Sequence, residues 1–252
     1  MYDLYGYIIL ALFFIIMLVI AVTSRNHLID KDYKTRYRPL MVIAFLLIVL
    51  DGSKQLRGIM VGYDKTIIPL YFCSFFNLLY PLAIYSKGRV KQVSQVMASV
   101  YSFMVALGLY LAPAMMIGQS AYNLFGGFLK LHTFVYHHLV VMYAMLSVSL
   151  QLVDIELKDD LLALLGGAAL YSIIGGLSSI ALKTNFHNFY PVNPGAFLTM
   201  RESLGDFLYI FIWGGAFVLA VIPSFFLFKL TYNIVGKRPI PEQDNFFNKT
   251  LR

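Results

Sequence analysis

The stretch YGYIILALFFIIMLVIAVT, residues 5–23, contains no charged side chain. A helix needs about 20 mostly apolar residues to cross the hydrocarbon core of a bilayer, and this stretch has that length. It is too long and unbroken for a signal-peptide core, no lysine or arginine precedes it, and no clear small-residue cleavage site follows it. It therefore predicts an anchor helix that stays in the mature protein.

Six more apolar stretches follow, near residues 39–56, 67–86, 95–117, 131–152, 161–182 and 207–229. Hydrophobic residues make up 59% of the 252 and charged residues only 13%, against about 25% charged in a typical soluble domain. The sequence predicts an all-α polytopic membrane protein, with seven transmembrane helices in one bundle over residues 1–235. A polar cytoplasmic tail, residues 236–252, would follow.

The distribution of lysine and arginine predicts the orientation. With the N-terminus outside, fourteen of the 20 basic residues fall in the inside segments, as the positive-inside rule requires. The prediction is N-out and C-in, in the cell membrane. The net charge of +7 is then explained by topology and by anionic lipid headgroups. Membrane lipids are the expected partners, with no nucleic acid and no soluble partner.

The sixth stretch carries a stripe of small residues. Ala168, Ser172 and Gly176 recur at four-residue spacing, which lets a neighbouring helix approach closely. We expect this stripe to pack against another helix of the same chain, with dimerisation as the less favoured alternative.

A few polar residues fall inside the apolar stretches, at similar depths. Cys73 lies six residues after the start of the third span and His137 six residues after the start of the fifth, which places both about 9 Å below the outer boundary at 1.5 Å per residue. Asp51 lies at a similar depth in the second span, and His187 lies just beyond the sixth. Polar groups at membrane depth are costly and usually functional. We expect one polar layer in the outer leaflet.

The residue types in this layer predict thiol chemistry. A histidine within hydrogen-bonding reach of Cys73 would take its proton and generate the nucleophilic thiolate. Asp51 or Asn185 could orient the imidazole of His137, in the manner of the third member of a catalytic triad. His138, His187 and Arg201 are candidate substrate-binding residues. No compact ligand spacing indicates a metal, and no cofactor is predicted.

Other interpretations stay open. A lone buried cysteine is usually inert, and neighbouring His137 and His138 point about 100° apart on a helix, so that both cannot face one pocket. Asp51, Lys54 and Arg57, at three-residue spacing, could form a structural ion pair. The same polar layer would also suit a small-solute or proton-coupled transporter, or a non-catalytic membrane subunit.

Three short motifs resemble one family. The string Ile68-Pro69-Leu70-Tyr71-Phe72-Cys73-Ser74, the segment Tyr136-His137-His138-Leu139 and the turn Thr184-Asn185-Phe186 are similar, in the same order, to the signatures of the YwaF-like bacterial integral membrane proteins. Relatives of that family include a eukaryotic transmembrane cysteine acyltransferase that remodels ether phospholipids and, more distantly, serpentine lipid hydrolases. The resemblance implies that Cys73 is the nucleophile and His137 the base. The family often has histidine two residues before the cysteine, where this chain has Tyr71.

Overall fold

The computed structural model describes residues 4–118, 120, 123–153, 155–191 and 195–236. All regular structure within these residues is helical, as predicted. The expected tail, 236–252, lies outside the described residues apart from Gly236. The helices are α1 Leu4–Leu28, α2 Tyr33–Val61, the 3-10 turn η1 Lys65–Ile67, α3 Phe72–Tyr85, α4 Gly88–Leu111, α5 Pro113–Ile117, α6 Phe128–Ser149, α7 Leu157–Leu182, α8 Ala196–Leu204 and α9 Asp206–Val235.

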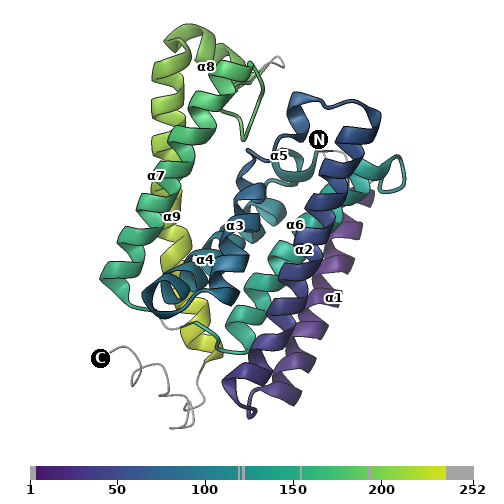
Figure 1. Ribbon diagram of the computed structural model, residues 1–252, viewed down its shortest axis with the longest axis vertical. Coiled ribbons are helices and arrows are strands. Elements are labelled where there is room, and N and C mark those ends of the chain that lie inside the picture. Colours follow the sequence, from purple (N-terminus) through teal and green to yellow (C-terminus); the bar gives the residue numbers. More distant parts are fainter. Residues whose placement is uncertain (1–3, 119, 121–122, 154, 192–194, 237–252) are drawn as a thin grey trace.

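Six helices, α1, α2, α4, α6, α7 and α9, are long and apolar enough to cross a membrane. The protein is therefore a multi-pass membrane protein. The α7–α9 pair stands on one side of the bundle and α1 with α2 on the other, with α3, α4 and α6 between them (Figure 1). Large apolar side chains of α1 are exposed along much of its length, as expected of a helix that faces lipid.

The helices alternate in direction between two ends of the bundle. Near the end of α1, Arg25 donates to the carbonyls of Ser149 and Val235, the last residues of α6 and α9. Tyr37 of α2 and Gln95 of α4 both donate to the carbonyl of Ala83, near the end of α3. We call this end of the bundle the Arg25 end. The opposite end, where α3 begins, is the Cys73 end.

The third predicted span needs correction. Residues 67–86 were expected to form one helix, but α3 begins only at Phe72 and has 14 residues, about 21 Å at 1.5 Å per residue. Pro69 explains the late start, because proline has no N–H to donate and disfavours helical geometry in the residue before it. The depth of Cys73, calculated for a continuous helix from Ile67, was therefore based on the wrong start: Cys73 lies in the first turn of α3.

A second proline divides the fourth predicted span, 95–117. Helix α4 ends at Leu111, and Pro113 begins the short helix α5. Between α7 and α9, outside the predicted spans, the structure has the additional helix α8.

The small-residue stripe of α7 packs within the chain, as predicted. Gly176 faces Ile210 of α9, and Gly214 of α9 faces Ser172. Because these residues leave so little side-chain volume between the backbones, α7 and α9 approach closely.

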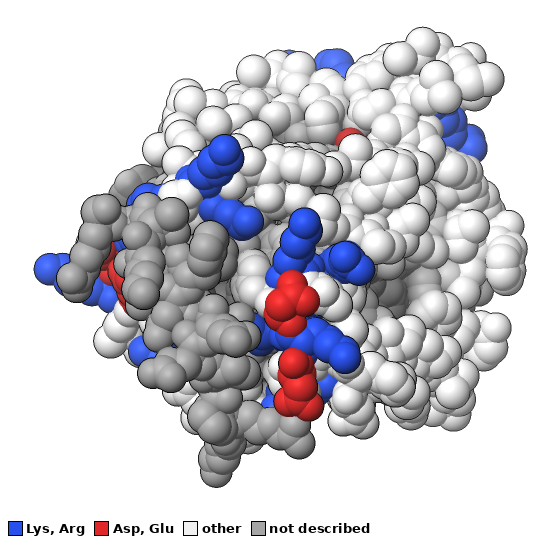
Figure 2. Space-filling view, turned by 60° about the horizontal axis from the view of Figure 1, so that its bottom comes forward, with Lys and Arg blue, Asp and Glu red and all other residues white. Residues whose placement is uncertain are grey.

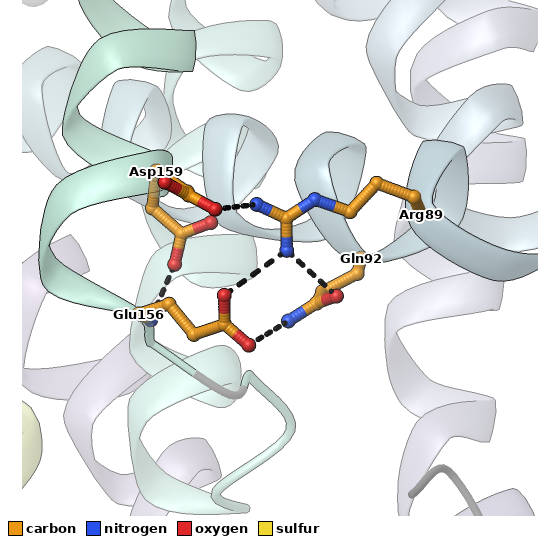
Figure 3. Close-up of polar contacts among 5 residues, drawn as sticks. Arg89, Gln92, Glu156 and Asp159 are labelled. Atoms are coloured by element: carbon orange, nitrogen blue, oxygen red, sulfur yellow. Dashed lines mark hydrogen bonds and ion pairs between the residues drawn. The ribbon is translucent and has the colours of Figure 1, made fainter. Parts of the chain in front are cut away.

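Lys, Arg, Asp and Glu side chains gather on the Arg25 end, whereas much of the neighbouring surface is uncharged (Figure 2). Part of this charge forms one exposed cluster. Arg89 pairs with Glu156 at 3.2 Å and with Asp159 at 3.3 Å, and Gln92 contacts Arg89 and Glu156 (Figure 3). Exposed pairs of this kind contribute about 0–1 kcal/mol each. The cluster joins the start of α4 to the start of α7 at the end of the bundle away from Cys73.

Candidate functional site

The structure brings Cys73 and His137 together. Cys73 Sγ lies 2.9 Å from His137 Nε2, although the two residues are 64 positions apart in the chain. Cys73 lies in the first turn of α3 and His137 near the middle of α6. His137 is 8% exposed, so the contact is largely shielded from solvent.

A backbone carbonyl of α6 fixes which ring nitrogen of His137 carries the proton. His137 Nδ1 lies 2.7 Å from the carbonyl oxygen of Thr133, one helical turn earlier. A carbonyl oxygen only accepts hydrogen bonds, so Nδ1 carries the proton of the neutral ring. Nε2 therefore presents its lone pair to the Cys73 thiol, which is the arrangement needed to remove the thiol proton.

Tyr136 holds α3 against α6 at this point. Its hydroxyl donates to the carbonyl oxygen of Cys73 at 2.9 Å and lies 3.1 Å from Oδ1 of Asn77. Asn77 is four residues after Cys73 and so lies on the same face of α3. These contacts fix the first turn of α3, and with it the sulfur, relative to His137.

Side chains of neighbouring helices donate to carbonyls of η1 and of the irregular segment between η1 and α3. Gln55 of α2 donates to the carbonyl of Ile67 at 3.0 Å, and Tyr171 of α7 donates to the carbonyl of Leu70 at 3.2 Å. Irregular backbone is tolerated at membrane depth only where such partners or a water-filled cavity replace the helical hydrogen bonds. Together with Tyr136 of α6, these contacts hold the helix start that carries Cys73 against three helices, α2, α6 and α7.

Asp51 and Lys54 lie on α2 beside this start. Lys54 is three residues after Asp51 on the helix, and its Nζ lies 5.5 Å above the ring of Tyr71. The ring of Tyr71 also packs edge-on against Phe186 at 5.3 Å. Tyr71, two residues before Cys73, thus contacts both Lys54 of α2 and Phe186 of the turn after α7.

Asp51 or Asn185 was predicted to orient the imidazole of His137, but a backbone carbonyl bonds its Nδ1 instead. The Thr133 carbonyl holds Nδ1 of His137, so no side chain is needed to select the tautomer. Asn185 organises its own turn: its Nδ2 lies 3.4 Å from Oδ1 of Asn188, and its Oδ1 accepts from the backbone N–H of Tyr190 at 3.4 Å. Asn185 therefore organises the turn that carries Phe186 and His187, whose rings contact Tyr71 and Phe72.

His187 is enclosed by aromatic rings, 4.8 Å from Phe217, 5.9 Å from Phe72 and 6.1 Å from Tyr171 between centroids. Its backbone has a φ of 52°, and its carbonyl accepts from the indole N–H of Trp213 at 2.9 Å. Burial lowers the pKa of His187 to about 4, so its ring is neutral at pH 7. Through Phe72 it packs beside the turn that carries Cys73.

Arg201 and His138 face away from the sulfur. Arg201 pairs with Asp206 at 3.0 Å, donates to the carbonyl of Pro191 at 2.7 Å and lies 3.9 Å above the ring of Tyr190. It thereby ties α8 to the start of α9. His138 Nδ1 bonds the carbonyl of Phe134, and its ring packs against α1.

Sequence reasoning missed Thr133 and Tyr136 as parts of the site. Tyr136 had a usable signal, because it adjoins His137 in a polar run, and Asn77 had one in its four-residue spacing from Cys73. Thr133 contributes a backbone carbonyl, for which residue type gives no signal. Among the described residues there is no group of three His, Cys, Asp or Glu side chains that could hold a metal ion.

No protein-family model, curated protein or solved structure matches this chain. The geometry of the site and the membrane architecture are therefore the basis for any functional argument.

Proposed function

We propose that this integral membrane protein is a thiol-dependent lipid acyltransferase or hydrolase, with Cys73 as nucleophile and His137 as general base. The observation that carries the proposal is the 2.9 Å contact between Sγ and Nε2, with the opposite nitrogen held by Thr133. The resemblance to the YwaF-like family, which includes a cysteine acyltransferase among its relatives, points in the same direction.

In the first half-reaction the Cys73 proton moves to His137 Nε2 as Sγ attacks the carbonyl carbon of a lipid acyl ester. The tetrahedral intermediate collapses, the C–O bond breaks, and the imidazolium returns the proton to the departing alkoxide. The products are an acyl thioester on Cys73 and an alcohol, here the deacylated lipid. The Thr133 carbonyl stabilises the imidazolium in between.

In the second half-reaction an acceptor hydroxyl attacks the thioester while His137 takes its proton. The C–S bond breaks, and the thiolate regains a proton from the imidazolium. A lipid hydroxyl as acceptor gives acyl transfer, and water gives hydrolysis. Both outcomes use the same two side chains, so access of water to the site decides between them.

Two features near the sulfur favour the developing negative charge. The amides of Phe72 and Cys73 lie in the first turn of α3, where N–H groups have no partner earlier in the helix. They are suited to an oxyanion. Lys54, whose Nζ lies 5.5 Å above the ring of Tyr71, adds a basic group on the α2 side.

We also propose seven crossings, N-out and C-in, in the cell membrane. Supporting this, α3 and the segment before it run from the Cys73 end to the Arg25 end, and Val235 lies beside Arg25, opposite the start of α1. That placement is the one that an odd number of crossings requires. Basic residues concentrated at the Arg25 end favour that end as the inside. The Cys73–His137 pair would then serve the outer leaflet, with membrane lipids as substrates.

The proposal is tested by labelling the purified protein with an alkyl-tailed chloroacetamide. Cys73 is the one cysteine of the chain, so thiol labelling reports on it alone. We expect Cys73→Ser to abolish labelling and His137→Ala to slow it by on the order of 100-fold, the low end for general acid–base catalysis. A phospholipid with a fluorescent acyl chain should then leave a hydroxylamine-sensitive label on Cys73.

The matched control is His138→Ala. His138 adjoins His137 and makes the same type of bond to a carbonyl one turn earlier, but its ring faces α1. Labelling should proceed in this variant at nearly the wild-type rate. Equal rates in His137→Ala and His138→Ala would reduce the Cys73–His137 contact to a packing interaction and would favour transport through the polar layer.

A further inference from the structure

A long apolar groove lies at the surface of the bundle, away from Cys73 and His137. Its volume is about 980 Å³, and it is bounded by α1 on one side and α4 on the other, with α6 forming the floor. Apolar side chains such as Phe14 and Leu18 of α1, Leu107 of α4 and Val141 of α6 line most of it. At the Arg25 end it also touches Arg25, Ser149 and Thr231.

The groove has the depth of a bilayer. Along α1 it extends from Tyr7 to Arg25, which is about 27 Å at 1.5 Å per residue and close to the ~30 Å of a hydrocarbon core. Tyr7 and Tyr110 lie towards one end and Arg25 at the other. Tyrosines favour the level of the headgroups, so Arg25 would meet the headgroups of the opposite leaflet.

Arg25 has donors to spare. It gives one hydrogen bond to the carbonyl of Ser149 at 2.7 Å and one to the carbonyl of Val235 at 2.9 Å, out of the five N–H groups of a guanidinium. Both partners are neutral, and no carboxylate among the described residues pairs with Arg25. A positive charge is thus held rigidly at the end of an apolar groove.

We propose that this groove is a binding site for an anionic glycerophospholipid, with the phosphate at Arg25 and an acyl chain along α1. An apolar wall suits a hydrocarbon chain, and a guanidinium binds phosphate oxygens through paired N–H groups. The groove's lining includes neither Cys73 nor His137, so the site is separate from the proposed reaction and does not depend on it.

The test is native mass spectrometry of delipidated protein offered equal amounts of phosphatidylglycerol and phosphatidylcholine with identical acyl chains. We expect a preference of about fivefold for the anionic lipid, since one basic residue near a lipid surface contributes about 1 kcal/mol. Arg25→Gln should remove the preference. Arg38→Gln, an exposed arginine near the start of α2, makes the same change in charge and should keep it.

In a second variant, a larger side chain at position 22 fills part of the groove while Arg25 is unchanged. Val22 lines the groove close to Arg25 and is 48% exposed, so Val22→Trp should fold and should reduce the binding of both lipids. This variant and Arg25→Lys, which retains the charge, keep the test decisive if Arg25→Gln fails to fold. Equal retention of both lipids by the wild type would identify ordinary boundary lipid. That result, an equal loss of preference in Arg38→Gln, or unchanged binding in Val22→Trp would overturn the proposal.

Discussion

The close approach of α7 and α9 predicts opposite effects for the same substitution at two glycines of α7. A Cβ added at Gly176 would lie 2.5 Å from Cγ2 of Ile210 on α9, whereas a Cβ at Gly166 would meet nothing within 4 Å. The methyl of Ile210 cannot swing away cheaply, because an isoleucine in a helix has one strongly preferred χ1 rotamer. Gly176→Ala must therefore separate the helices or strain Ile210.

The magnitude follows from two opposing contributions. Overpacking a well-packed contact costs about 1–3 kcal/mol, and replacing a helical glycine by alanine gains up to about 1 kcal/mol. Gly166→Ala should show only the gain and Gly176→Ala the difference. Since the gain is common to both variants, their unfolding free energies should differ by the overpacking cost alone, about 1–3 kcal/mol.

Trp213 provides the assay. It is the one tryptophan of the chain, lies on α9 and bonds the carbonyl of His187 in the segment after α7. Its fluorescence should therefore follow the separation of α7 and α9 during denaturant unfolding in micelles. Equal stabilities of the two variants, or a stabilised Gly176→Ala, would refute the inference that α7 and α9 pack too closely at Gly176 to accept a methyl group.

Three further predictions concern Tyr136, His187 and the exposed Arg89 cluster. Tyr136→Phe removes the hydrogen bond to the Cys73 carbonyl and should cost about 1 kcal/mol in unfolding free energy, with slower chloroacetamide labelling of Cys73; an unchanged labelling rate would contradict the positioning role. Because the pKa of folded His187 is about 4 and that of the unfolded chain about 6.5, the unfolded state binds more protons between these values. The stability contributed by neutral His187 is thus complete above pH 6.5 and falls by roughly 2–3 kcal/mol as the pH drops to 4; unfolding titrations should show a flatter pH profile for His187→Asn. Arg89→Gln breaks only exposed ion pairs and should change the unfolding free energy by less than about 1 kcal/mol without affecting Cys73 labelling.

Apolar length and composition were sufficient to predict a helical multi-pass bundle, because a helix is the one structure in which a single segment satisfies its own backbone in lipid. They failed at residues 68–71, where the apolar window continues but Pro69 disfavours an α-helix. Pro69 was visible in the sequence. The partners that make the non-helical segment tolerable, Gln55 and Tyr171, come from other helices and were not.

The site was predictable to a similar degree. Similar depth singled out Cys73 and His137, and the structure places them in contact, while their catalytic role stays a prediction. The role expected of Asn185 could not be judged from sequence, because it depends on the positive φ angles of His187 and Asn188, which turn the segment back on itself. The Thr133 carbonyl carries no residue-specific signal at all.

The two hydrogen bonds of Arg25 also bear on how the chain is assembled during synthesis. They join residues 124 and 210 positions apart, and the second requires the last residue of α9. Until translation reaches Val235, the first helix lies in the bilayer with Arg25 lacking one of its two hydrogen-bond acceptors. Insertion of the final helix forms the hydrogen bond to Val235. In a chain truncated before Val235, α1 should therefore lack this bond to α9 and should be exposed to membrane quality control.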